Sequence, residues 1–142
     1  MSLAMTVTER ETFLADLHVG VISFVDPAAG PLTAPIWYDY DPQVGLWVII
    51  GPESRKGQLA SVGSRISLVA QSEAMPYKYV SVEGPITSIE PSEEGALLSM
   101  ATRYLGEEMG KGYAAQSTGD NVTVLMNVER WLTVDYGKAN LG

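Results

Sequence analysis

The chain has 142 residues, of which 46% are hydrophobic and 18% charged, a composition typical of one folded domain and unlike that of a disordered chain. Its formal net charge of −8 argues against binding to nucleic acid or to an anionic membrane surface, because both need a basic face. Without any cysteine, the chain forms no disulfide, no thiolate metal site and no cysteine nucleophile.

The sequence contains neither an apolar segment of about 20 residues nor a basic start followed by an apolar leader. We therefore expect a cytoplasmic protein that does not enter a membrane. We expect residues 1–7 to form an N-terminal tail, in which residues 1–4 remain from cloning and Met5 is the natural start.

The first predicted element is a helix from about Glu9 to Leu17. Thr8 and Glu11 have the spacing of a capping box. In this motif the threonine hydroxyl accepts a hydrogen bond from the glutamate backbone N–H, and the glutamate carboxylate accepts one from the threonine backbone N–H. The buried stripe of this helix would consist of Phe13, Leu14 and Leu17.

Apolar runs separated by turns rich in glycine and proline predict most of the remaining elements. We expect strands at residues 20–25, 32–40, 46–50, 65–70, 78–89, 122–128 and 131–135. The second strand should pair back on the first, and the unbroken apolar run 46–50 should be buried on both faces. In the fifth strand, valines alternate with polar residues, so one face should pack in the core while the other is solvated or lines a site.

Three helical segments accompany these strands. We expect a short helix from Ser54 to about Val62, a longer one from Pro91 to about Leu105, and a partial helix with a loop in the glycine-rich segment 106–120. Six to seven mostly hairpin-connected strands with a few short helices predict a mainly β (α+β) domain, an antiparallel barrel with helical additions, spanning residues 1–142.

The segment Gly51-Pro-Glu-Ser-Arg-Lys-Gly57 is a candidate anion site between a strand and a helix. Ser54 can cap one free N–H at the helix start, and the other free N–H groups and the helix dipole favour an anion there. Arg55 and Lys56 are adjacent cations in a chain with nine Lys and Arg against 17 Asp and Glu. A phosphorylated ligand would account for them; the alternative is a capping serine followed by two solvated side chains.

Self-contained catalytic machinery is not visible in the sequence. The one histidine, His18, follows the first predicted helix, where an interaction with free carbonyl groups explains it. One histidine and no cysteine disfavour hydrolase triads and zinc sites, so neither a hydrolase nor a metalloenzyme is expected. If the protein is an enzyme, chemistry carried by a cofactor fits best.

The ordered set of segments 32–40, 46–50, Ser54-Arg-Lys56 and 79–84 resembles the pyridoxamine 5′-phosphate oxidase-like flavoproteins, which have the FMN-binding split β-barrel fold. The similarity spans about Phe13 to Pro91. It implies a split antiparallel β-barrel of six to seven strands, non-covalently bound FMN, and hydride transfer through the flavin to or from a small molecule. It also implies a homodimer with two flavin sites at the subunit interface.

The resemblance also implies which residues bind the cofactor. Arg55 and Lys56 would hold the phosphate with help from Ser54, and the ring would lie along the strand containing Pro35 and Tyr38. Trp131 would be supplied by the partner subunit, and Tyr38 and Tyr79 are candidates for hydrogen bonds near the ring. The full set of implied cofactor contacts is Pro35, Ile36, Trp37, Tyr38, Ile49, Ile50, Ser54, Arg55, Lys56, Tyr79 and Trp131. Trp37, Ile49 and Trp131 are equally explained as core residues.

The sequence departs from the vitamin B6 oxidase at two places. Leu32 and Thr33 stand where a further phosphate-binding arginine would be expected, and residues 135–140 do not match the basic substrate motif. Oxidation of pyridoxamine phosphate is therefore disfavoured. A deazaflavin (coenzyme F-420)-dependent reductase, or a flavin- or haem-binding module without turnover, remains an alternative, and the substrate cannot be read from the residues.

Overall fold

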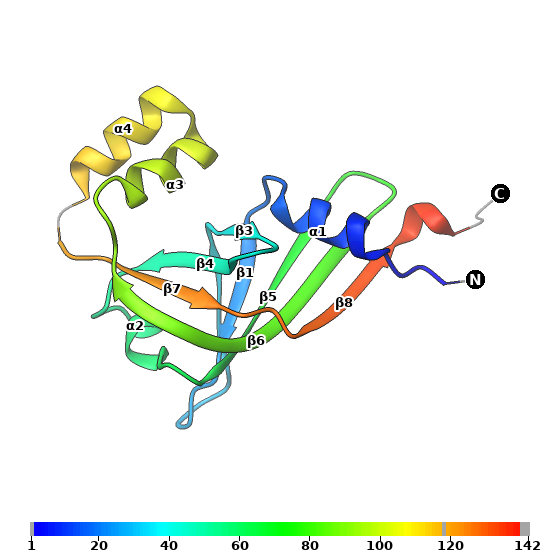
Figure 1. Ribbon diagram of the computed structural model, residues 1–142, viewed down its shortest axis with the longest axis horizontal. Helices are drawn as coiled ribbons and strands as arrows, with labels where there is room; N and C mark the ends of the chain where they lie inside the picture. The colour runs from blue at the N-terminus through cyan, green and yellow to red at the C-terminus, as the bar shows by residue number, and fades with distance from the viewer. Residues whose placement is uncertain (1, 118, 140–142) are drawn as a thin grey trace.

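The computed structural model describes residues 2–117 and 119–139. Met1 of the expected tail, Thr118 of the glycine-rich segment and Asn140 of the C-terminal segment lie outside these residues. Within them, a curled antiparallel sheet is flanked by short helices (Figure 1). The strands are β1 Gly20–Phe24, β2 Leu32–Ile36, β3 Asp39–Asp41, β4 Gly45–Ile50, β5 Arg65–Ser72, β6 Lys78–Pro91, β7 Val122–Met126 and β8 Arg130–Asp135. The helices are α1 Val7–Ala15, α2 Arg55–Leu59, α3 Ala96–Leu105 and α4 Glu107–Gln116, followed by a 3-10 turn at Tyr136–Lys138.

The long strand β6 joins the two halves of the barrel. The strand order is β2-β1-β5-β6-β7-β4-β3, and β8 also pairs with β6. The first part of β6 pairs with β5 and β8, whereas its last part pairs with β7 beyond a register shift between Ile86 and Ser88. The sheet can bend at this irregularity because the ladder is interrupted there. The two end strands, β2 and β3, leave the barrel open along one side.

Gly84 allows two segments to cross closely at the bend. A Cβ at this position would collide with the carbonyl of Asn127, in the connection between β7 and β8. The core on the inner face contains Phe24, Leu68, Val80, Val82, Ile86, Val124 and Met126, each at most 1% exposed. Val80 and Val82 occupy the packed face of β6 as the alternation predicted.

The predicted mainly β fold is confirmed, with two corrections to the strands. The segment 32–40 is not continuous: β2 pairs with β1, but Asp39 and Tyr40 belong to β3 and pair with β4. The strand 46–50 is also not buried on both faces. Leu46, Val48 and Ile50 point into the core, while Trp47 and Ile49 are only partly buried on the opposite face.

The first helix begins earlier than predicted. Thr6 is its N-cap, and the capping box joins Thr6 and Glu9, with Glu9 N 3.1 Å from the Thr6 hydroxyl and Thr6 N 2.8 Å from the Glu9 carboxylate. The same Thr-x-x-Glu spacing occurs at Thr8, which explains the error. Leu14 is fully buried, whereas Leu17 is 54% exposed and does not belong to the buried stripe.

The segment before α1 lies against the far end of the chain. The Leu3 carbonyl accepts a hydrogen bond from Asp135 N at 2.8 Å, and Met5 N donates to the Thr133 hydroxyl at 2.9 Å. Met5 itself is 9% exposed and belongs to the core. Residues 2–6 are thus held against β8.

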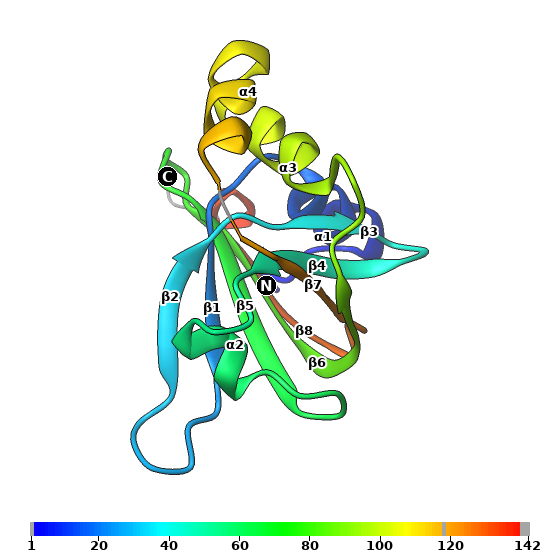
Figure 2. The ribbon, with the colours of Figure 1, turned by 90° about the vertical axis from the view of Figure 1, so that its left-hand side faces the viewer.

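Helices α3 and α4 form a hairpin that rises from one end of the barrel (Figures 1 and 2). Helix α3 starts at Ala96 and not at Pro91, because β6 extends through Pro91 and Gly95 takes a left-handed conformation (φ 83°) before the helix. Within the segment 106–120, α4 spans Glu107–Gln116, which agrees with the expected partial helix. In the described part of the chain, none of the helices has the length and apolar character needed to cross a membrane.

Candidate functional site

The loop between β4 and α2 has a fixed shape. The Ser54 hydroxyl accepts a hydrogen bond from Gly57 N (3.1 Å) and donates one to the Gly51 carbonyl (2.7 Å), which confirms Ser54 as the helix N-cap. A Cβ on Gly57 would collide with the Gly51 carbonyl and lie 2.6 Å from the Pro52 carbonyl. The loop therefore folds back onto Gly57, and its geometry requires glycine at that position.

Arg55 and Lys56 point to different surroundings. The Arg55 guanidinium lies 2.6 Å from the carboxylate of Asp26, in the turn between β1 and β2. The hydrogen bonds that this carboxylate accepts from Ala28 N and from Arg55 hold its pKa below the usual range. Lys56 is partly buried and lines a cavity. In this structure Lys56 faces the cavity while Arg55 is paired with Asp26, so the two cations point to different partners.

The cavity next to Lys56 has a volume of 390 Å³, within the usual range of small-molecule sites. It lies where the end of β2 meets the end of β4. The structure brings seven of the predicted cofactor contacts to its walls, namely Pro35, Ile36, Trp37, Ile49, Ile50, Ser54 and Lys56. Lys56 supplies the positive charge, and the β-strand side chains supply apolar walls.

Strand β2 presents backbone groups as well as side chains to this region. It is an end strand that pairs only with β1 in the described sheet. In an antiparallel edge strand, alternate N–H and C=O groups point away from the neighbouring strand and are free to bind a ligand. The residues Pro35 and Ile36 at the cavity wall belong to this edge.

Tyr38 does not reach the cavity. Its side chain is fully buried on the other side of the chain, and its hydroxyl donates to the Leu14 carbonyl at 2.7 Å. Burial raises the pKa of this hydroxyl well above its ordinary value. The Tyr38 backbone N–H donates to the Tyr104 hydroxyl at 3.0 Å. The expected hydrogen bond from Tyr38 to a ring is thus wrong for the side chain, which has a structural role.

Tyr79 and Trp131 also lie apart from the cavity of this chain. Tyr79 is on the outer face of β6, between Gln71 of β5 and Val134 of β8. Trp131 packs edge-on against Tyr40 (5.9 Å between ring centroids), and the Arg10 guanidinium lies 4.5 Å from the Trp131 ring centre. These two contacts pack the Trp131 ring against residues of its own chain.

The helical hairpin completes the cavity with residues that the sequence did not indicate. Leu97 and Met100 come from α3, Tyr113 from α4, and Ser117 and Asn121 from the segment that follows it. Trp37 stacks on Tyr104 with 5.2 Å between ring centroids and an angle of 7°. It also contacts Tyr113 at 5.1 Å, so Trp37 lies between the hairpin's two helices and the barrel.

Arg103 fixes the hairpin on the barrel. Its guanidinium donates to the Ala15 and Asp16 carbonyls, both at 3.0 Å, and to the Tyr38 carbonyl at 3.3 Å. The first two carbonyls end α1, where a cation is favourable. The Tyr104 hydroxyl adds a hydrogen bond to the His18 carbonyl at 2.6 Å. The position of the cavity wall thus depends on the last turn of α3.

Neither His18 nor any acidic residue of the described chain lines the Lys56 cavity. The His18 ring stacks on Phe13 at 4.3 Å between centroids, and burial lowers the pKa of the imidazole. No group of three or more metal-ligating side chains occurs within residues 2–117 and 119–139. The candidate site therefore consists of the Lys56 cavity.

The sequence matches no family model and no curated protein. Solved structures nevertheless share its fold over most of their length. A conserved hypothetical protein from Mycobacterium tuberculosis has a TM-score of 0.74 and 20% identity, and the match covers 99% of this chain and 92% of the Mycobacterium chain. An F420 reductase has a TM-score of 0.68 and 21% identity over 86% and 94% of the two chains. HutZ, a haem storage protein from Vibrio cholerae, has a TM-score of 0.63 and 17% identity over 95% and 96%. These similarities confirm the fold implied by the sequence resemblance, the split β-barrel of the pyridoxamine 5′-phosphate oxidase-like proteins.

Proposed function

We propose that the Lys56 cavity binds the flavin nucleotide FMN and that the protein is a flavin-dependent oxidoreductase. The observation that carries this proposal is the convergence on one cavity of an edge strand, apolar walls and a partly buried lysine. A planar ring with polar edges and a phosphate at its far end needs these three features. Bound flavin would supply hydride transfer at its N5 atom.

The residues of this chain would then have distinct tasks. Ile36 and Ile49 would pack against the ring, and the free backbone groups of β2 would meet its polar edge. Lys56 would donate a charge-assisted hydrogen bond to the phosphate. Its partly buried position would strengthen this interaction. Tyr113 and Met100 would cover the ring from the hairpin and exclude water from it. We expect a cytoplasmic homodimer in which Tyr79 lies nearer the partner's cavity.

A deazaflavin is the second candidate, and one observation favours it. Lys56 is the only lysine or arginine that lines the cavity in the described chain, because Arg55 is paired with Asp26. A single cation suits the singly charged phosphodiester of F-420 better than the terminal dianion of FMN. The similarity in fold to an F420 reductase agrees with this candidate.

A haem-binding module is the third candidate. HutZ shares the fold, but in this chain the single histidine packs against Phe13 outside the cavity. Histidine is the commonest protein ligand of haem iron in oxygen-binding proteins and peroxidases. Haem would need a different axial ligand here, so we place it after the flavins.

The absorption spectrum of the purified protein is the first test. We expect oxidised flavin bands, or their appearance when FMN is added to colourless protein. Calorimetric titration with FMN, riboflavin and F-420 then ranks the cofactors, because riboflavin lacks the phosphate. If none of the three binds at protein concentrations up to about 100 μM, which is about 100 times a Kd of 1 μM, the proposal is contradicted.

A further inference from the structure

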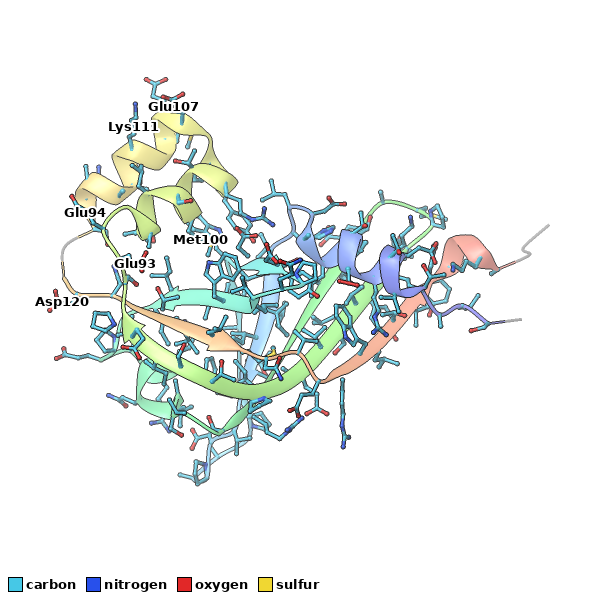
Figure 3. The ribbon with its side chains drawn as sticks, viewed as in Figure 1. Glu93, Glu94, Met100, Glu107, Lys111 and Asp120 are labelled. Atoms are coloured by element: carbon cyan, nitrogen blue, oxygen red, sulfur yellow. The ribbon has the colours of Figure 1, made fainter. Side chains whose placement is uncertain are left out.

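A second cavity lies against the first, with the side chains of Ile49 and Met100 between them. Its volume is 370 Å³, and these two residues line both cavities. Met100 is 5% exposed and projects from α3 toward the sheet (Figure 3). A molecule in the second cavity would therefore be close to whatever the first cavity holds.

The walls of the second cavity are mostly apolar and lie outside the barrel core. Trp47 of β4 and Leu125 of β7 face it, on strands that pair at this position. Trp47 points away from the core because its neighbours Leu46 and Val48 point into it, at 1% exposure each. The sheet thus offers an indole and a leucine side chain to a ligand, and α3 covers part of this surface.

All charged residues around this cavity are acidic. They are Asp39, Glu90 and Glu93, and the described lining includes neither lysine nor arginine. Asp39 is paired with Arg103 at 3.6 Å. Glu90 and Glu93 are exposed and have no ion-pair partner in the described residues. Two unneutralised carboxylates beside an apolar cavity favour a cation, and the Trp47 indole adds cation–π attraction.

We propose that the second cavity binds a small organic cation with an apolar or aromatic body, such as a quaternary or primary amine. The cavity provides the volume and apolar contact, and the carboxylates select the sign of the charge. This binding does not depend on the proposed function. Only the position of the cation beside a flavin rests on it.

The test uses the full chain and three probes of similar size: benzyltrimethylammonium, the neutral benzyl alcohol and the anion phenylacetate. Calorimetry should show benzyltrimethylammonium binding at least about tenfold more tightly than phenylacetate. The chain has three tryptophans, at positions 37, 47 and 131. A saturable change in fluorescence should therefore persist in Trp131→Phe, which lines neither cavity, and disappear in Trp47→Phe.

Matched charge variants test the role of the carboxylates. Glu90→Gln with Glu93→Gln should weaken benzyltrimethylammonium by about two- to fivefold for each substitution, the range for exposed ion pairs. The control, Glu94→Gln with Glu107→Gln, changes the net charge equally. Neither residue lines this cavity, and Glu107 lies on the far side of the hairpin (Figure 3). The control should leave the affinity within about twofold of the parent protein.

Equal binding of phenylacetate, or equal weakening in both charge variants, would overturn the proposal. So would a dimer, seen by sedimentation, that Trp47→Glu dissociates while the monomer stays folded, because a second copy would then occupy this face. The proposed function fails separately. Cation binding without any binding of FMN or F-420 would remove the flavin assignment and leave this inference intact.

Discussion

The Arg55 guanidinium and the Asp26 carboxylate lie 2.6 Å apart, and this ion pair connects α2 to the turn between β1 and β2. The pair separates the roles of two adjacent cations, since Lys56 alone lines the cavity. A basic dipeptide that the sequence presents as one feature is thus divided between a structural contact and a candidate binding contact.

Lys56→Met should weaken FMN binding by about 1.5–3 kcal/mol, the usual contribution of a hydrogen bond to a charged group. Arg55→Met should have a smaller effect, because its partner in the structure is Asp26. Calorimetric titration of each variant with FMN and with riboflavin measures the difference. Riboflavin affinity should be the same in Lys56→Met and the parent protein.

Lys111→Met is the control for this prediction. Lys111 pairs with Glu107 on the outer side of α4, away from the cavity (Figure 3). The substitution removes the same charge, so an equal loss of FMN affinity would mean that general electrostatics act instead of a contact. An FMN affinity unchanged in Lys56→Met would contradict the phosphate assignment.

Tyr104→Phe should reduce the free energy of unfolding by about 1–3 kcal/mol. The variant leaves the Tyr38 N–H without the hydroxyl that accepts its hydrogen bond, and removes the bond to the His18 carbonyl. Tyr113→Phe is the matched control, since both tyrosines contact Trp37 but Tyr113 is 47% exposed. Urea unfolding should show less than about 0.5 kcal/mol for the control.

Glycine substitutions in α4 should have opposite signs. Gly110→Ala places a Cβ 2.8 Å from backbone atoms of Thr102 in α3, so we expect destabilisation by about 1–3 kcal/mol. Gly112→Ala meets no atom within 4 Å and should stabilise the helix by up to about 1 kcal/mol. Thermal unfolding of the two variants checks both signs, and destabilisation by Gly112→Ala would contradict the α4 packing.

Acid should weaken the contact between the two ends of the chain. Hydrogen bonds from Lys138 and from Thr6 lower the pKa of Glu9 from 4.5 to about 2. The folded state therefore binds this proton less readily than the unfolded chain, so the stabilisation is present above pH 4.5 and is lost as the pH falls toward 2.

Glu9→Gln should flatten the decrease in stability across this pH range, measured by urea unfolding at several pH values. Glu94→Gln, at an exposed site, serves as the control and should retain the parent's pH dependence. Identical profiles for Glu9→Gln and the parent protein would show that the ion pair with Lys138 does not contribute.

The strands could be predicted from sequence because their apolar residues alternate with a period of two and end at turn residues. Val80 and Val82 show this most clearly, with exposures of 0% and 1%. The helix cap could not be decided locally, since two overlapping Thr-x-x-Glu sequences fit equally well. The upstream one is used in the fold, where Lys138 from the other end of the chain lies 2.6 Å from Glu9.

The candidate site was only half visible in the sequence. Residues on β2 and β4 and in the Ser54 loop could be found because they are contiguous with recognisable strands. Met100 and Tyr113 could not, because their contribution depends on how the hairpin sits on Trp37. The glycine-rich segment 106–120 predicted a partial helix and a loop, but not that Gly110 lets α4 approach α3. The Tyr38 error arose from assigning adjacent residues to one site when the chain turns Trp37 and Tyr38 to different sides.

Strand β6 has a consequence for how the protein unfolds. Its 14 residues supply hydrogen-bond partners to β5 and β8 along one part and to β7 along the other. If the strands on one side of the bend separated from β6, this strand would lose order, and the strands paired with its other part would lose their support. The domain should therefore unfold as one cooperative unit. Amide protons on both sides of Thr87 should then exchange with solvent at the same, globally limited rate.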